Sequence, residues 1–432
     1  MSLINKIMEK INIHINRLGR IKDSDITIDQ LMLFCGASGM GKSYVTMLSH
    51  YFFYVWLNPK RINQFMIDHD FDYDKMRSYM NNSGRALEIQ KSDLEQWLAQ
   101  DAIKFLKYLL GNESLNANIS VKLPATVPEI IAFDYEETIE GIVNSEEVYV
   151  ILHSDHLKYR VKEKGINEES PFAVLLRSEM MHCIFGEYQA LRNYFILPPS
   201  RGALLTEKVT PQSGLYKKFD ESLSILRTLN VIEDNVSNQA SDMLVSLMDG
   251  KIGQDKDLSF YYENDDVHIP LSAAASSIRE IGVLQLLLEK TSLANDAILF
   301  EEPEAHLHPM KQRLMADVIA RFFKAGAYMQ ITTHSDYFLH RFNELLQLGK
   351  LKRKLDSGKY ANICGDMDED TEAAIDYDGI QAYLVDGIEG GYSRIKPMKL
   401  DDGIPFTTFR EAIMLSLNKE HQLNTLLENE NN

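Results

Sequence analysis

Gly36-Ala37-Ser38-Gly39-Met40-Gly41-Lys42-Ser43 fits the pattern G-x-x-x-x-G-K-S/T of a phosphate-binding loop. The apolar run Leu31–Cys35 before it predicts a buried strand, and Tyr44–Trp56 after it predicts a helix. The glycines allow backbone amides to point at an anion, and the helix N-terminus adds positive potential. The pattern therefore predicts nucleotide binding, with Lys42 in contact with the outer phosphates and the Ser43 hydroxyl bound to Mg²⁺.

Two strands are expected before this loop. Ile11, Ile13 and Ile15 alternate with polar residues, which is the period of a half-buried strand. A turn at Gly19 leads to a second alternating segment that contains Ile26. The loop is therefore expected in a sheet that begins with an N-terminal β hairpin.

A second apolar strand ends in two carboxylates. Ala297–Phe300 is followed by Glu301 and Glu302, which is the form of a Walker B motif with Glu in place of the usual Asp. A phosphate loop with Mg²⁺ also needs an oriented water for hydrolysis. Glu301 is therefore predicted to hold the hydration shell of the metal, and Glu302 to act as the general base.

Two further positions are candidates for the same site. The apolar strand Ala327–Thr333 ends at His334, which is predicted to contact the γ-phosphate, while Ser335 is expected to cap the next helix. Ser277 and Glu280 have the spacing of a capping box at a helix start. The same helix start could meet an anion held by another subunit.

These motifs together resemble a known family. Gly36–Ser43, Ser276–Glu280, Ala297–Pro309 and Ile331–Ser335 occur in the order found in the ABC-type ATPase heads of SMC-like and OLD-like proteins. More narrowly, they resemble the AAA ATPase subunits of bacterial antiviral systems such as PARIS and Septu. The segment 194–201 resembles a further strand-Pro-Arg element of those proteins.

The resemblance implies an ATP-sandwiched dimer, which in the antiviral relatives assembles into larger oligomers. The loop, Glu301 and Glu302 of one subunit would face Ser277 of the other, and His334 would be the switch histidine. Such a subunit would be a sensor and scaffold that controls a separate toxic effector, often a nuclease, in response to a phage-encoded trigger. The family has glycine where this chain has Ile278, which is consistent with slow turnover.

The expected architecture is an α/β, ABC-type P-loop head with a mixed sheet. Residues 1–56 would form its first part and 194–348 its second. Residues 57–193 are expected to be a helical and β insertion, and 349–432 a C-terminal segment that completes the head.

Local patterns predict several elements outside the motifs. Ser92–Leu110 is predicted to be a helix with a capping box at Ser92 and Glu95. Val148–Lys162 is predicted to be a strand pair, and Pro171 to be the first residue of a helix. A hairpin is expected over 258–269, and a solvated loop over 366–378.

Composition limits the possible functions. The 432 residues carry a net charge of −18, which argues against nucleic-acid binding through overall charge. The three cysteines, Cys35, Cys183 and Cys364, have no spacing suited to zinc and fit a reducing, cytoplasmic location. No signal peptide, membrane-spanning segment or long coiled coil is expected.

Three alternatives remain open at this point. The first is an OLD-like ATP-dependent nuclease, for which Asp366, Asp368 and Asp370 would be candidate metal ligands. The second is a DNA-repair ATPase of the SMC-like group. The third is a scaffold that binds ATP without hydrolysing it.

Overall fold

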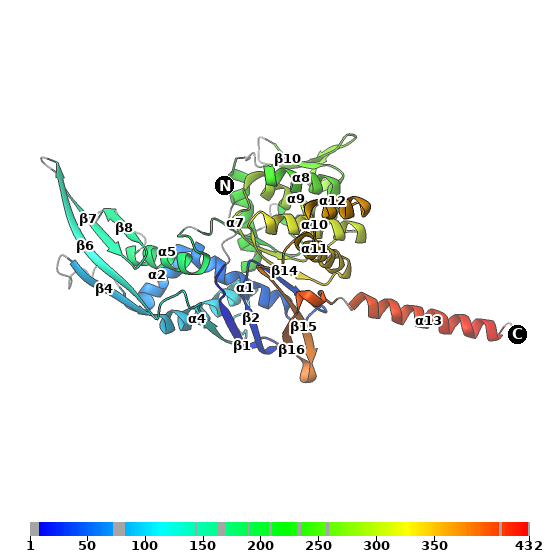
Figure 1. Ribbon diagram of the computed structural model, residues 1–432, viewed down its shortest axis with the longest axis horizontal. Helices are drawn as coiled ribbons and strands as arrows, with labels where there is room; N and C mark the ends of the chain where they lie inside the picture. Colours follow the sequence, from blue (N-terminus) through cyan, green and yellow to red (C-terminus); the bar gives the residue numbers. More distant parts are fainter. Residues whose placement is uncertain are drawn as a thin grey trace.

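The computed structural model describes residues 8–71, 83–142, 145–162, 170–188, 190–206, 210–230, 235–255, 259–405 and 408–430. Within these residues, the centre of the molecule is one mixed β-sheet (Figure 1). Its strands lie in the order β5 (Ala117–Lys122), β1 (Asn12–Leu18), β2 (Ile21–Thr27), β16 (Tyr392–Pro397), β15 (Ile380–Ile388), β3 (Leu31–Cys35), β14 (Tyr328–Thr333), β13 (Ala297–Glu301) and β9 (Tyr194–Leu197). The predicted α/β class with a mixed sheet is confirmed.

The strands from β15 to β9 run parallel and are covered on both faces. All five residues of β3 are buried. Met32 and Phe34 belong to one hydrophobic core, while Leu31, Leu33 and Cys35 belong to the other. This alternation explains the continuous apolar run, because a parallel strand between two helical layers has no polar face.

Helices from different parts of the chain build the two cores. One core contains α1 (Lys42–Leu57), α4 (Lys91–Leu110) and α5 (Pro171–Phe185), and the other contains α9 (Ser276–Lys290), α10 (Pro309–Lys324) and α11 (Asp336–Lys354). Further helices within the described residues are α2 (Pro59–Asp68), α6 (Gly202–Thr206), α7 (Gly214–Thr228), α8 (Asn235–Met248), α12 (Ser357–Asp366), η2 (Leu271–Ala273), η3 (Glu389–Gly391) and η4 (Leu400–Asp402).

Both ends of the chain contribute to the main sheet. β1 and β2 form the predicted antiparallel hairpin, with Gly19 in the turn. β15 and β16 bring residues after 349 into the same sheet. β5 lies within the expected insertion 57–193 but pairs with β1, so part of that segment belongs to the main sheet.

The rest of the insertion contains a separate antiparallel sheet that extends away from the body (Figure 1). Its strands are β4 (Ser83–Gln90), β6 (Ile130–Ile142), β7 (Ser145–His153) and β8 (Lys158–Lys162). The predicted strand pair is β7 and β8, and α5 begins at Pro171 as predicted. A third sheet, β10 (Lys251–Gln254), β11 (Phe260–Glu263) and β12 (His268–Pro270), contains the predicted hairpin.

The last helix, α13 (Thr408–Glu430), extends away from the body on the side opposite the insertion (Figure 1). The side chains at 414–426 are all exposed. None of the helices in the described ranges combines the length and the apolar character needed to cross a bilayer.

Two predicted helix caps are wrong. α4 has Gln90 rather than Ser92 at its N-cap, and the Glu95 carboxylate instead accepts a hydrogen bond from the backbone N–H of Leu123 at 2.8 Å. α9 has Ala275 at its N-cap, without a side-chain cap. The capping-box pattern assigned Glu95 and Glu280 to the N-termini of their own helices. In the structure, each carboxylate instead accepts a hydrogen bond from the backbone of a segment distant in sequence.

His50 lies within α1, completely buried beside β14. Its Nδ1 is 2.8 Å from the Gln330 side-chain oxygen, and its Nε2 has no hydrogen-bond partner among the described residues. Burial lowers the pKa of His50 from 6.5 to about 4, and the Gln330 contact opposes this shift. Because the pKa is lower in the folded state, His50 favours folding above about pH 6.5, and this contribution is lost as the pH falls through 4.

Replacing His50 by Asn should therefore make the protein less sensitive to acid. The unfolding free energy of both proteins should fall between about pH 7 and pH 4. The decrease should be smaller for the variant, by on the order of 3 kcal/mol. Chemical denaturation over this pH range measures the difference. The exposed His421→Asn is the control and should behave as the wild type; an equal pH slope for His50→Asn would contradict the assignment.

Candidate functional site

The candidate site lies where three neighbouring parallel strands end. β3 leads into Gly36, β14 leads into His334, and β13 leads into Glu302. The register aligns the ends of all three strands at the same edge of the sheet. The order β3-β14-β13 therefore brings together three segments that lie far apart in the sequence.

The loop 36–43 depends on glycine at two positions. Gly36 has φ of 133°, and a Cβ there would lie 2.3 Å from the carbonyl oxygen of Val385. Gly41 has φ of 103° and is the N-cap of α1. Arg20 supports the loop by donating to the carbonyl of Gly39 at 2.6 Å. Both glycine positions exclude a side chain, for steric and conformational reasons.

Lys42 contacts the carbonyl oxygens of its own loop. Its Nζ donates to Gly36 at 2.8 Å and to Ala37 at 2.9 Å, and the residue is buried. Burial lowers the pKa of Lys42, and nearby carboxylates oppose this shift. The ammonium group is therefore held at the loop, beside several negative charges.

The Ser43 hydroxyl and the Glu301 carboxylate lie close together at the start of α1 and the end of β13. Burial raises the pKa of Glu301 to about 7, and the nearby Ser43 hydroxyl and Lys42 ammonium oppose the shift. Glu301 Oε1 is buried without a hydrogen-bond partner among the described residues. Hydroxyl and carboxylate oxygens are the ligands that Mg²⁺ prefers, so these residues fit a magnesium ion.

Glu302 and His334 face each other at the strand ends. The Glu302 carboxylate lies 3.5 Å from Nδ1 of His334, and both side chains are partly exposed. Glu302 has φ of 48°, which is unusual for a residue with a side chain. Its backbone N–H donates to Thr332 at 3.1 Å, which holds this conformation. Strained backbone of this kind is often found at functional sites.

The sequence motifs assigned no function to Glu304, but in the structure its side chain contacts the end of β14 next to His334. It is buried, and its Oε1 accepts hydrogen bonds from the backbone N–H of His334 at 3.0 Å and from the hydroxyl of Thr333 at 2.8 Å. Ser335 caps α11 through Phe338, as predicted. Glu304 therefore fixes the backbone at His334. In the sequence, its position two residues after Glu302 was the only feature that could have indicated this role.

Arg201 is a second residue that the motif analysis did not assign. It is completely buried, and its guanidinium donates to the carbonyls of Glu280 at 2.9 Å and of Pro198 and Glu301 at 3.2 Å. It thereby joins α9 to the end of β13. The sequence feature that could have indicated this buried arginine is its position after an apolar strand and two prolines.

Ser277 is half-buried near the start of α9. The Glu280 carboxylate, expected to cap this helix, accepts a hydrogen bond from the backbone N–H of Gly202 at 3.1 Å. No hydrogen bond or ion pair in the part of the chain that the structure describes joins Ser277 to the loop 36–43. Within the described residues, Ser277 thus has no polar contact with the loop of its own chain.

The aspartates of the expected solvated loop are arranged differently from a metal pair. Asp366 and Asp368 are exposed, whereas Asp370 forms an ion pair with Arg321. Glu369 of the same loop binds Arg341 at 2.6 Å. Ion pairs with α10 and α11 thus fix this loop, and Asp370 already has a cation as its partner.

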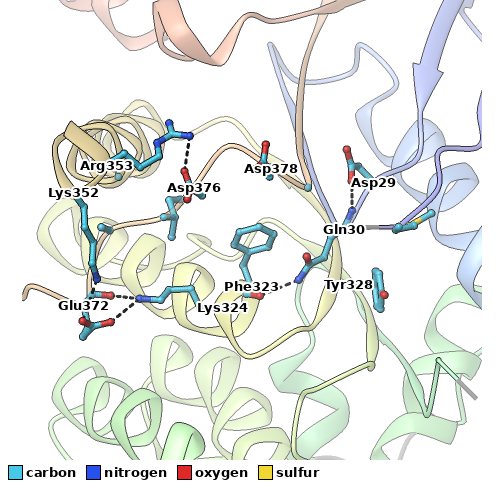
Figure 2. A pocket seen from close by; sticks show the side chains of 15 residues that line it. Asp29, Gln30, Phe323, Lys324, Tyr328, Lys352, Arg353, Glu372, Asp376 and Asp378 are labelled. Atoms are coloured by element: carbon cyan, nitrogen blue, oxygen red, sulfur yellow. Dashed lines mark hydrogen bonds and ion pairs between the residues drawn. The ribbon is translucent and has the colours of Figure 1, made fainter. Parts of the chain in front are cut away.

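A cavity of about 490 Å³ lies at the amino ends of β3, β14 and β15 (Figure 2). Lys324 and Lys352 contact Glu372, and Arg353 contacts Asp376. Parallel strands place their amino and carboxyl ends at opposite edges of a sheet. The cavity is therefore separate from the predicted nucleotide site.

Comparison with known proteins supports part of this assignment. A family model described as an AAA ATPase domain matches residues 205–339. The match includes Ser277, Glu302 and His334 but not the loop 36–43. No curated protein matches the chain. The match supports an ATP-binding ATPase domain in this part of the chain.

Two solved structures are similar over most of the chain. One is the SMC head bound to the C-winged helix domain of ScpA, with 13% identity, 92% of this chain and 98% of that chain covered, and a TM-score of 0.38. The other is the SMC head domain from Thermotoga maritima, with 10% identity, 91% and 100% covered, and a TM-score of 0.32. At these values the likeness carries no information about function.

Proposed function

We propose that this chain hydrolyses ATP, with Mg²⁺, at the ends of β3, β14 and β13. One observation carries the proposal: a glycine-dependent loop, a serine beside a buried carboxylate and a glutamate–histidine pair lie at the same edge of one sheet. In this proposal Gly36, Ala37, Ser38, Gly39, Met40, Gly41, Lys42 and Ser43 form the phosphate cradle.

Each residue has a distinct chemical task. Lys42 and the loop amides neutralise and orient phosphate oxygens. Ser43 and Glu301 hold Mg²⁺, which supplies further charge neutralisation when it is bound. Glu302 accepts the proton of the attacking water, and His334 donates a hydrogen bond to the γ-phosphate.

The same proposal includes an ATP-sandwiched dimer. Ser277 lies near a helix N-terminus that has no side-chain cap, which leaves backbone N–H groups available to an anion. Because no hydrogen bond or ion pair among the described residues joins Ser277 to the loop of its own chain, we assign Ser277 to the loop of a second subunit. Ile278 follows Ser277 and adds bulk there, which favours slow turnover.

The wider role that we propose is that of sensor and scaffold in bacterial antiphage defence. The support is the resemblance of the motifs to the ATPase subunits of antiviral systems. ATP binding and hydrolysis would control oligomerisation and a separate effector, with a nuclease as the expected effector and a phage product as the trigger. The cytoplasm is the proposed location, because all three cysteines are free and buried.

Glu302→Gln should lower the ATP hydrolysis rate by about 100-fold or more, because the amide cannot accept the proton from water. Nucleotide affinity should remain close to that of the wild type. Phosphate release and binding of a fluorescent ATP analogue measure the two effects. Lys42→Ala is the matched comparison and should lose binding itself; a Glu302→Gln variant with wild-type turnover would remove Glu302 from its role.

Glu302→Gln should also accumulate as a dimer when ATP and Mg²⁺ are added, because the bound nucleotide is not consumed. Light scattering after size-exclusion chromatography measures the mass. Adding Ser277→Arg should prevent the dimer, since the larger side chain would fill the space for the phosphate of the partner. ATP binding by the monomer should persist, and a dimer that forms regardless of residue 277 would contradict the sandwich.

Cells that express the wild-type chain with its neighbouring genes should produce fewer plaques after phage infection than cells with Lys42→Ala. The reason is that the proposed release of the effector needs the nucleotide. Plaque counts over a panel of phages provide the measurement. Equal counts for both strains, with both proteins present at equal amounts, would count against the defence role while leaving the ATPase proposal intact.

A further inference from the structure

A cluster of metal-binding side chains lies in the insertion, away from the main sheet of the nucleotide site. Glu179 and Cys183 are one helical turn apart on α5, so both point to the same side of that helix. His156 lies in the turn between β7 and β8, which packs on this side of α5. Within the described residues, one nitrogen, one oxygen and one sulfur atom of the three side chains all lie within 4.8 Å of one another.

The carboxylate at the centre of the cluster is buried. Glu179 accepts a hydrogen bond from the Ser154 hydroxyl at 2.6 Å, and its Oε1 lies 2.5 Å from Nδ1 of His156. The Cys183 sulfur is 4.0 Å from the same oxygen. Burial, followed by the negative charges of Glu179 and Asp155, raises the pKa of Cys183 to about 12. The buried Glu179 carboxylate, in contact with Ser154, His156 and Cys183, gives the cluster an anionic oxygen ligand for a cation.

The turn that carries His156 is held in place by several hydrogen bonds. The backbone N–H of Ser154 donates to the Leu157 carbonyl at 2.8 Å, and the N–H of Leu157 donates to the Ser154 hydroxyl at 3.0 Å. The Tyr188 hydroxyl donates to the carbonyl of His156 at 2.7 Å. The side chain of His156 is 43% exposed, while Glu179 is buried. A metal ion could therefore enter from the solvent side of a largely preformed site.

We propose that His156, Glu179 and Cys183 bind one Zn²⁺ ion, with water in the fourth position. Imidazole nitrogen, carboxylate oxygen and thiolate sulfur are the three donor types that zinc accepts in tetrahedral sites, whereas Mg²⁺ and Ca²⁺ avoid sulfur. On coordination, the Cys183 thiol releases its proton to the solvent. The cysteine spacing gave no sign of this site, because its ligands come from a turn and a helix that only the fold brings together.

Zinc at this position would join the β7–β8 turn to α5. The four-stranded sheet of the insertion would then be fixed to a helix whose residues also belong to the core that contains α1 and α4. Zinc should consequently raise the Tm of the chain by a few degrees, because it binds the folded state and not the separated ligands. This consequence does not depend on ATP hydrolysis.

The test uses the full chain without an affinity tag, treated with a chelator and then given Zn²⁺ or Co²⁺ alone. We expect one bound zinc per chain by elemental mass spectrometry. With Co²⁺ we expect tetrahedral d–d bands and a thiolate-to-cobalt charge-transfer band. Cys183→Ser should abolish the charge-transfer band and weaken zinc binding by at least ~100-fold, the upper end of the loss caused by removing a supporting residue.

Two further variants make the outcome decisive. His156→Ala alters a partly exposed side chain and should weaken zinc binding without unfolding the chain, which circular dichroism checks. Cys364→Ser removes a buried cysteine outside the insertion and should keep both the zinc and the cobalt spectrum. The absence of bound zinc in the wild type, or equal binding and spectra for Cys183→Ser and Cys364→Ser, would overturn the proposal.

Discussion

The parallel alignment of β3, β14 and β13 is the constraint on which the candidate site depends. Backbone hydrogen bonds fix the register of these strands, and both faces of the sheet are buried. A shift of one residue would turn each strand's side chains to the opposite core. The loop, the two carboxylates and the histidine therefore keep their relative positions without needing direct bonds to one another.

This alignment gathers more negative than positive charge. Glu301, Glu302 and Glu304 lie near one lysine, and the raised pKa of Glu301, about 7, reflects the cost of burying its charge. A triphosphate entering without a metal would add further negative charge to the same place. Mg²⁺ would offset both sets of charges, so electrostatics favours the joint binding of metal and nucleotide in the proposed site over binding of nucleotide alone.

Sequence patterns correctly predicted those helices and strands that are determined by residues close together in the sequence. The hairpin around Gly19, the start of α5 at Pro171 and the apolar strand β3 follow from alternation, ring geometry and burial. The glutamates at 95 and 280 were misassigned, because the capping-box pattern considers only neighbours in sequence. Long-range partners such as Leu123 and Gly202 become visible only when the chain is folded, and the zinc ligands were missed for the same reason.

Arg201 connects α9 to the end of β13, beside the candidate site. Its guanidinium has no contact with solvent, and it bonds to the backbone of both Glu280 and Glu301. A buried cation that loses such bonds is strongly destabilising, so α9 and the end of β13 cannot separate at low cost. If a second subunit contacts the start of α9 through Ser277, as proposed, a displacement of α9 would reach the backbone of Glu301, next to Glu302, through Arg201. In the proposed dimer, Arg201 would thereby connect the subunit interface to the carboxylates that we propose as catalytic.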